Sequence, residues 1–345
     1  MTVGAAFVMA ASLAGAFLAG HESATDPVAD DLGEGCRGTV PAAAAKTYLE
    51  SDHIAVTEGP LQHPGTLRCS VTPAAITSEA DEDARLDVVI SPGEYGADYL
   101  DLSGIPGVTV PFGHGWVGSY APGEAHPSVG VATLLLECPT QPGDALMVRV
   151  YGDWSREDDE LAAQKDEQLA VVTARLARQA GPEWGCDGHP GEVPESLPLE
   201  EPTSDIPAAE ATGTCSDVLS AETAAVLGVE TVSETPAGLA LVEHCGARGD
   251  EEEYDLLAYY GPSAEDTGMG QPHLAATAAC GRGQGWAHYA AFTDENVDEQ
   301  PERAAALTDA FAAFVTTSAQ RHGCETPNGQ DLETTLGTHQ RQDTT

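Results

Sequence analysis

The sequence predicts an α+β protein built from two tandem copies of one small disulfide-bonded module, each an antiparallel sheet packed against two helices. Three observations support this prediction. Eight cysteines fall into two groups of four. Each group frames a short helix, several strands and a long helix in the same order. The long helix also repeats its position, because Leu169 and Leu307 are 138 residues apart, as are Cys186 and Cys324.

The composition indicates an acidic protein stabilised by cystines. Its 345 residues carry a formal net charge of −42, from 56 acidic and 14 basic side chains. Like charges repel, so this balance disfavours binding to nucleic acid or to an anionic membrane, and it favours a cationic or neutral partner. No CxxC pair occurs, which argues against zinc-ribbon and thioredoxin-like domains. The repeated cysteines instead predict disulfides and an oxidising compartment.

Residues 1–20 are expected to be a signal peptide or a membrane anchor, and the sequence leaves both open. From Val3 to Gly20 no side chain is charged; the length suits a marginal transmembrane helix and the Ala/Gly content suits a signal peptide. His21 stands where a lipoprotein signal needs cysteine, so thioether lipidation is not available. Residues 21–35 are an acidic spacer. The rest of the chain is therefore expected outside the cytoplasm, secreted or held by a single-pass anchor, with membrane contact only through this first segment.

Module one is expected over 36–186. Its first helix, 40–49, is rich in alanine and has Pro41 in the first turn, where a missing N–H costs nothing. Its long helix, 155–179, carries an inward apolar stripe. Strands are expected over 67–71, 86–91, 133–137 and 145–151.

Module two is expected over 214–324, after a Pro- and acid-rich linker at 187–213 without Lys or Arg. A linker of this composition is extended, so the modules are expected to fold as separate beads. Ser220 is a suitable N-cap for the first helix and Gly228 a suitable end. Strands are expected over 239–245, 254–260, 274–280 and 286–292, followed by a long helix over 302–318 and a disordered polar tail over 325–345.

Hairpin geometry selects one of the three ways in which the four cysteines of a module can pair. In module one, Cys138 lies beside the turn that leads into a strand, and the helix after that strand has to run back towards the turn. The helix therefore brings Cys186 to Cys138, which leaves Cys36 to pair with Cys69. The same argument in module two pairs Cys280 with Cys324 and Cys215 with Cys245.

Each module starts with a cysteine before an alanine-rich helix and has its second cysteine in a following strand. On these residues the sequence resembles actinobacterial exported lipoprotein-like domains of unknown function, which are similar in plan to extracellular sensor domains of mycobacterial kinases. The resemblance implies an α+β module at the cell surface and brings no catalytic residues. It is carried by Cys215, Leu219, Ser220, Ala221 and Cys245, and more loosely by Cys36, Val40, Pro41, Ala42 and Cys69.

The two copies differ by an insertion in module one. The second and third cysteines are 69 positions apart in module one and 35 apart in module two, so about 34 residues are added within 92–130. Any ligand binding is expected in this Gly-rich segment, because aromatic rings on exposed loops give a large contact area. The alternative is that the aromatics extend the sheet and are buried. The candidate binding residues are Phe112, His114, Trp116 and Tyr120.

No motif in the sequence compels a chemistry. A GxSxG elbow is absent, the 11 histidines lack metal-ligand spacing, and pairs of carboxylates are uninformative in so acidic a chain. We therefore expect no catalytic residues, no metal and no cofactor. The sequence favours a non-enzymatic tandem module that binds an unknown cell-surface or extracellular partner. The alternatives are an exported hydrolase with an unrecognised site and a structural cell-wall spacer.

Overall fold

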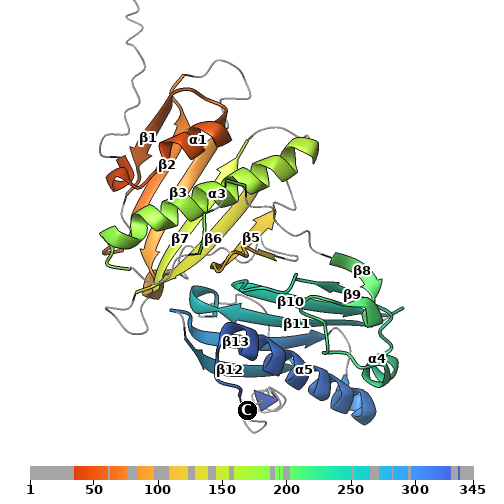
Figure 1. The fold of residues 1–345 in the computed structure, drawn as a ribbon. Coiled ribbons are helices and arrows are strands. Elements are labelled where there is room, and N and C mark those ends of the chain that lie inside the picture. The colour runs from red at the N-terminus through yellow and green to blue at the C-terminus, as the bar shows by residue number, and fades with distance from the viewer. Residues whose placement is uncertain are drawn as a thin grey trace, which may run out of the picture.

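The structure is a computed structural model. It describes residues 35–60, 63–75, 84–96, 109–122, 129–138, 145–154, 159–186, 191–193, 195–196, 203–250, 252–264, 272–281, 283–293, 297–327 and 333–334. The expected signal or anchor segment, most of the acidic spacer and most of the polar tail lie outside these ranges. The described chain is a mixed α+β protein with two antiparallel sheets, each of which carries helices on one face (Figure 1).

Sheet one belongs to the N-terminal half of the chain. Its seven strands lie in the order β1-β2-β3-β7-β6-β5-β4, and α1 (Ala42–Leu49) and α3 (Asp159–Glu183) pack on it. The strands are β1 (Ile54–Glu58), β2 (Leu67–Pro73), β3 (Arg85–Pro92), β4 (Val110–Pro111), β5 (Val117–Pro122), β6 (Val129–Glu137) and β7 (Ala145–Asp153).

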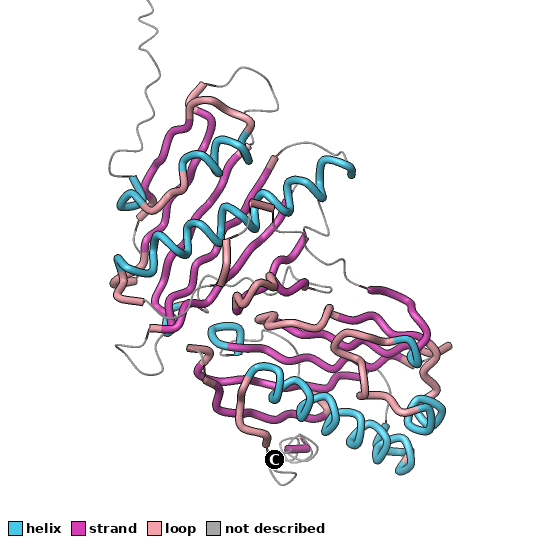
Figure 2. The backbone as a smooth tube through the Cα atoms, viewed as in Figure 1, coloured by secondary structure: helices cyan, strands magenta, loops and turns pink. Residues whose placement is uncertain are grey.

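Sheet two belongs to the C-terminal half. Its order is β14-β12-β13-β11-β10-β9-β8, and α4 (Ala221–Leu227) and α5 (Pro301–His322) lie together on one face (Figure 2). The strands are β8 (Thr203–Pro207), β9 (Thr231–Glu234), β10 (Val242–Arg248), β11 (Glu253–Tyr260), β12 (Leu274–Cys280), β13 (Gly285–Thr293) and β14 (Glu333–Thr334).

Strand β2 alternates between buried and more exposed residues. In β2, Leu67, Cys69 and Val71 are buried beneath the helices while the residues between them are more exposed, because successive side chains of a strand point to opposite faces. The caps of α4 match the prediction. The Ser220 hydroxyl accepts a hydrogen bond from the Thr223 amide at 3.0 Å, and Gly228 ends the helix with φ 74°.

Both sheets share one internal strand order. Sheet one contains β1-β2-β3-β7-β6 and sheet two contains β9-β10-β11-β13-β12. In both series the first three strands are neighbours in chain order, and the last two are neighbours in reversed chain order. The remaining strands lie at the edges of the two sheets. Strands β5 and β4 extend sheet one beyond β6, whereas β14 pairs beyond β12 and β8 beyond β9 in sheet two.

All four expected disulfides are present. Cys138–Cys186 and Cys280–Cys324 join the end of the second-last strand before each long helix, β6 or β12, to the end of that helix, as the hairpin argument predicts. Cys36–Cys69 and Cys215–Cys245 tie the segment before each first helix to a strand. Four disulfides fit an oxidising compartment outside the cytoplasm. In the described part of the chain, no helix is long and apolar enough to cross a membrane.

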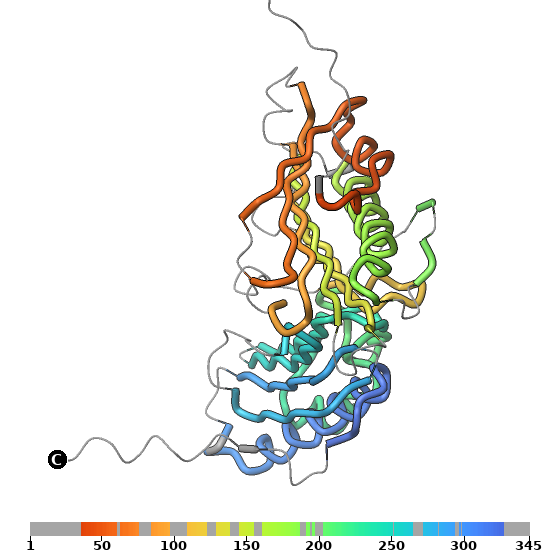
Figure 3. The backbone as a smooth tube through the Cα atoms, turned by 90° about the vertical axis from the view of Figure 1, so that its left-hand side faces the viewer, coloured from red at the N-terminus to blue at the C-terminus, as the bar shows by residue number. Residues whose placement is uncertain are grey.

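The two halves are packed against each other, which differs from the expected separate beads. One buried cluster fills the helix side of sheet one. The second cluster fills sheet two but also takes in Val117, Leu135, Ala145 and Met147 from β5, β6 and β7. Figure 3 shows sheet two lying against one end of sheet one. The expected linker is also partly ordered, since β8 pairs with β9 in sheet two.

Candidate functional site

The inserted segment does not present its aromatic residues as a group to solvent. Phe112, Trp116 and Tyr120 are only 1–2% exposed. His114 is exposed, in a tight turn with φ 52°. The alternative noted from the sequence therefore holds as far as burial goes: Tyr120 is buried within β5, and Phe112 and Trp116 are buried in the turn between β4 and β5. Ligand binding by these four residues has no support from their placement.

Trp116 is covered by residues from the segment between the two modules. Its Nε1 donates a hydrogen bond to the Glu192 carbonyl at 2.7 Å. A Cβ on Gly191 would lie 2.5 Å from the indole Cδ1, so only a glycine allows this backbone to pass so close to the ring. The indole therefore helps to hold the interdomain segment on sheet one.

The insertion forms the joint between the two sheets. The Ser119 hydroxyl on β5 accepts a hydrogen bond from the Leu241 amide at 2.6 Å, and the Thr109 hydroxyl donates to the Val242 carbonyl at 2.6 Å. The Gly118 amide donates to the Leu239 carbonyl at 2.9 Å. Each of these bonds links the inserted segment to the segment that leads into β10. The residues that distinguish module one thus dock module two.

A buried polar network joins β10 to the end of α5. Glu243 is fully buried on the helix-facing side of β10. Its carboxylate accepts hydrogen bonds from Arg321 at 2.7 Å and from the Ser318 hydroxyl at 2.6 Å. His322 Nε2 lies 2.9 Å from the same carboxylate, and the Tyr260 ring stacks on the imidazole with 3.5 Å between centroids.

The network contains a serine, a histidine and an acid, but its geometry is not that of a nucleophilic triad. A triad needs the histidine to bind the serine and the acid to bind the far side of the histidine. Here Ser318 and His322 both bind Glu243, and the other ring nitrogen of His322 lies 2.8 Å from Gln284 Oε1. Serine and histidine are at most 1% exposed, so a substrate has no access.

The pKa of Glu243 is set by its burial and by its partners in opposite directions. Burial alone would raise the pKa of Glu243, but the hydrogen bond and charge of His322, with the Arg321 guanidinium, hold that pKa below its ordinary value of 4.5. A buried carboxylate of this kind is stable only while its partners remain. The arrangement fixes α5 on sheet two and is structural.

A second polar cluster lies in module one, at the N-terminal part of α3. The Tyr120 hydroxyl donates a hydrogen bond to Asp166. Burial raises the pKa of Asp166 to about 6, and the Tyr120 hydroxyl opposes that shift. Neighbouring Lys165 is buried, donates to the Tyr48 carbonyl and pairs with Glu50 at 2.9 Å. This cluster attaches α3 to α1 and to the inserted strand β5.

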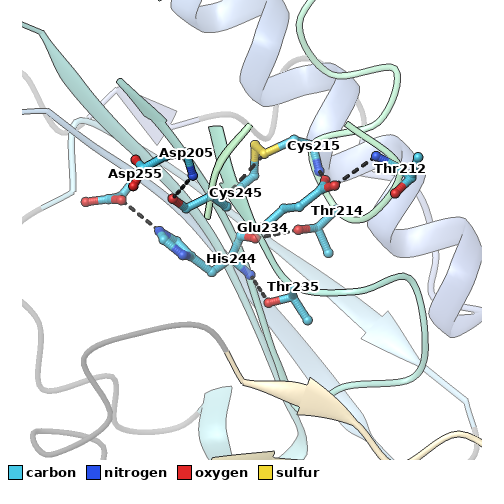
Figure 4. The surroundings of a disulfide bond; sticks show 10 residues. Asp205, Thr212, Thr214, Cys215, Glu234, Thr235, His244, Cys245 and Asp255 are labelled. Atoms are coloured by element: carbon cyan, nitrogen blue, oxygen red, sulfur yellow. Dashed lines mark hydrogen bonds and ion pairs between the residues drawn. A yellow bond between two sulfur atoms is a disulfide. The ribbon is translucent and has the colours of Figure 1, made fainter. Parts of the chain in front are cut away.

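The surroundings of the Cys215–Cys245 disulfide show another structural carboxylate (Figure 4). Glu234, 1% exposed, accepts hydrogen bonds from the Thr212 amide at 2.8 Å and the Cys215 amide at 2.9 Å. These bonds supply partners for the backbone of the segment before α4. On the opposite side of β10, His244 pairs with Asp255 at 2.7 Å.

The face of sheet two opposite the helices carries the largest exposed apolar side chain in the described chain. On β13, Ala287, Tyr289 and Ala291 are buried towards α5, so Trp286 and His288 point the other way. The Trp286 side chain is 62% exposed. In register beside them are Ala279, Thr277 and Tyr259, and further along lie the half-buried Leu257 and Phe292.

Reasoning from the sequence missed both the Glu243 network and Trp286. Alternation along 286–292 could have placed Trp286 on the face away from the helix, because Tyr289 has the opposite parity. No local feature of the sequence marks Glu243 as buried, because an acidic residue in so acidic a chain is expected at the surface. Among the described residues, no group of three or more His, Cys, Asp or Glu side chains is arranged to hold a metal ion.

Comparisons of this chain with protein-family models, with curated proteins and with solved structures find no match.

Proposed function

We propose that the protein is a non-enzymatic binding protein outside the cytoplasm, whose binding surface is the face of sheet two around Trp286. This surface, here called the Trp286 face, consists of Trp286, His288, Thr277, Leu257 and Phe292. It replaces the inserted segment as the proposed location of binding. The polar clusters described above, each built on a buried charged side chain, serve to hold elements together.

The exposure of Trp286 carries the proposal. A tryptophan left 62% exposed forgoes a large part of its hydrophobic stabilisation. Large aromatic side chains in this position are typical of binding surfaces, because they bury a large area at a small cost in conformational entropy. Burial lowers the pKa of His288, which favours its neutral form beside the indole.

The chemistry of the partner follows from charge. The chain has a formal net charge of −42, so an anionic partner is repelled and a neutral or cationic one is accommodated. The four disulfides support a location outside the cytoplasm. Whether residues 1–20 are cleaved or retained as an anchor is a separate question, which N-terminal sequencing of the exported protein answers.

We also propose that the two halves are copies of one ancestral module, related in plan to actinobacterial exported domains. The shared strand order and the matching disulfides support a duplication. The insertion in module one and strand β8 in module two are then later additions that join the copies. A hydrolase is less well supported, because the Ser318–Glu243–His322 cluster is inaccessible.

Substitution of Trp286 tests the binding surface. The probe is a purified, insoluble actinobacterial cell envelope, and the readout is the fraction of protein that sediments with it. We expect the wild-type chain to sediment and Trp286→Ala to lose at least about tenfold in apparent affinity, as for removal of a central aromatic anchor. The melting temperature should stay within about 2 °C, because an exposed side chain contributes little to stability.

Two matched controls locate the effect. Val226→Ala removes the other exposed large apolar side chain, on α4, and should leave sedimentation unchanged. Trp116→Ala removes a buried indole and should lower the melting temperature strongly. If Trp286→Ala sediments like the wild type, the Trp286 face is not the binding surface. If the wild type does not sediment at all, the envelope is not its partner and a spacer function is favoured.

A further inference from the structure

The free edges of a β-sheet carry unpaired N–H and C=O groups that can pair with another strand, and proteins usually protect them with proline, charge or short length. Three of the four edges here follow that rule. Strand β4 has two residues and ends in Pro111; β8 contains Asp205 and Pro207; and β1 ends in the exposed Glu58.

The fourth edge is different. Strand β12 runs for seven residues, Leu274–Cys280, without a charge or a proline. One of its sides pairs along its whole length with β13. Its other side would be an unprotected edge if the chain did not return to it after α5.

The C-terminal segment contacts this edge at both ends. At one end Cys324 lies opposite Cys280, to which it is disulfide-bonded, and the Glu325 amide donates to the Ala279 carbonyl at 2.8 Å. At the other end β14 pairs antiparallel with β12, Thr334 opposite Leu274 and Glu333 opposite Ala275. The polar tail expected from the sequence to be disordered thus supplies a strand.

We propose that the outer edge of β12 is a peptide-binding site for one extended strand, and that the C-terminal segment of this chain is its resident occupant. Backbone hydrogen bonds provide the binding, as in other cases of strand addition. The alanines at 275, 276, 278 and 279 leave the edge open to close approach by a backbone of almost any sequence. This inference does not depend on the Trp286 face.

The resident strand is held more by tethering than by its own contacts. Among the residues that the structure describes, two pairs join β14 to β12. The disulfide at Cys280–Cys324 keeps the start of the segment beside the edge, which raises its effective concentration into the millimolar range, about what a short tether gives. A strand from another molecule must therefore exceed that concentration, or make more pairs, to displace it.

The test uses the full chain with Glu333→Pro and Thr334→Pro together. Proline has no N–H and is not accommodated in a paired strand, so the double variant should release β14. Hydrogen exchange at the Ala275 amide, which points to the same side of β12 as the Ala279 carbonyl that Glu325 binds, should then quicken by about tenfold or more, whereas the Leu274 amide points to β13 and should exchange as in the wild type. A matched control, Asp343→Pro with Thr344→Pro, makes the same change beyond β14 and should leave exchange at these amides as in the wild type.

A peptide in trans tests acceptance of a strand directly. A fluorescent peptide with the sequence of residues 325–345 should bind the released variant about tenfold more tightly than the wild-type chain, whose edge is occupied. The same peptide with proline at 333 and 334 should bind neither. A dimer of the variant that the peptide dissociates would also support the edge as a strand acceptor. Unchanged exchange, or equal binding of the peptide to variant and wild type, would overturn the proposal.

Discussion

Two partly or fully buried carboxyl groups respond to their surroundings in opposite ways. Glu243 has a lowered pKa because His322 and Arg321 outweigh its burial. The pKa of Asp166 is raised to about 6, because the effect of burial outweighs that of a single hydrogen bond from Tyr120. The pairing of each group, and not burial alone, decides whether its ionised form stabilises the fold. The two groups therefore predict opposite dependences of stability on pH.

At Asp166 the folded pKa, about 6, lies above the ordinary value of 3.8. Its contribution to stability is therefore fully present below pH 3.8 and is lost as the pH rises through 6. Asp166→Asn keeps an oxygen to accept the Tyr120 hydrogen bond but does not ionise. We expect this variant to be more stable than the wild type by about 1–2 kcal/mol at pH 8, after allowance for solvent screening, and equal to it near pH 3.

Urea unfolding at pH 3, 5 and 8 measures this difference. The control Asp309→Asn removes an exposed negative charge from α5 and shows how much a smaller net charge alone changes the free energy of unfolding. A gain for Asp166→Asn at pH 8 no larger than that of the control would contradict the raised pKa.

At the scale of elements, one network holds α5 on sheet two in addition to the apolar stripe. The stripe of Leu307, Phe311 and Phe314 follows the helical i, i+4, i+7 spacing of the sequence and is buried. The polar end of the helix was not evident. It depends on Glu243 from a strand that lies about 80 residues earlier, so that only the folded chain brings the partners together.

Glu243→Gln should destabilise the protein by about 3 kcal/mol at pH 7, because Arg321 and His322 lose the charge that compensates their burial. The extra stability of the wild type is fully present at a pH above 4.5, the ordinary pKa of this carboxyl group. It is lost as the pH falls through the lower pKa of Glu243 in the folded state. The deficit of the variant should therefore shrink near pH 3. Glu253→Gln, which breaks an exposed pair with Arg248, is the matched control and should cost less than about 1 kcal/mol in chemical denaturation. Equal effects of the two substitutions would mean that the network adds nothing to stability.

Repeats and alternation made much of the fold predictable. The equivalent cysteines set the disulfides, and the repeated order of elements around them placed the central strands. The inserted segment was harder, because a glycine-rich stretch with aromatics has the same composition in an exposed loop and in a short strand buried at an interface. Trp116 and Trp286 illustrate the difficulty: the first is buried against Gly191 from a distant segment, and the second is 62% exposed on the face of sheet two opposite the helices.

At the scale of the whole molecule, the joint makes the two modules one unit. Leu135 is on the face of β6 away from α3 and belongs to the buried cluster of sheet two. A Cβ on Gly261 would lie 2.6 Å from the Leu135 Cδ1, so the absence of a side chain there makes room for the leucine. Domains that share buried apolar surface and interdomain hydrogen bonds unfold together when the interface free energy is large enough.

We therefore expect the full chain to unfold in one calorimetric transition, with equal calorimetric and van't Hoff enthalpies. Leu135→Asp places a charge in the joint while leaving the core under α3 intact, because the side chain points away from that core. This substitution should split the unfolding transition in two. Module two should melt first, because it loses contact with the four apolar side chains that module one contributes to its buried cluster. Val131→Asp, on the same face of β6 but half-exposed, should leave one transition. Two transitions in the wild-type chain would show that the modules unfold independently, as the composition of the linker suggests. The contacts of Ser119 and Thr109 would then align the modules without coupling their stability.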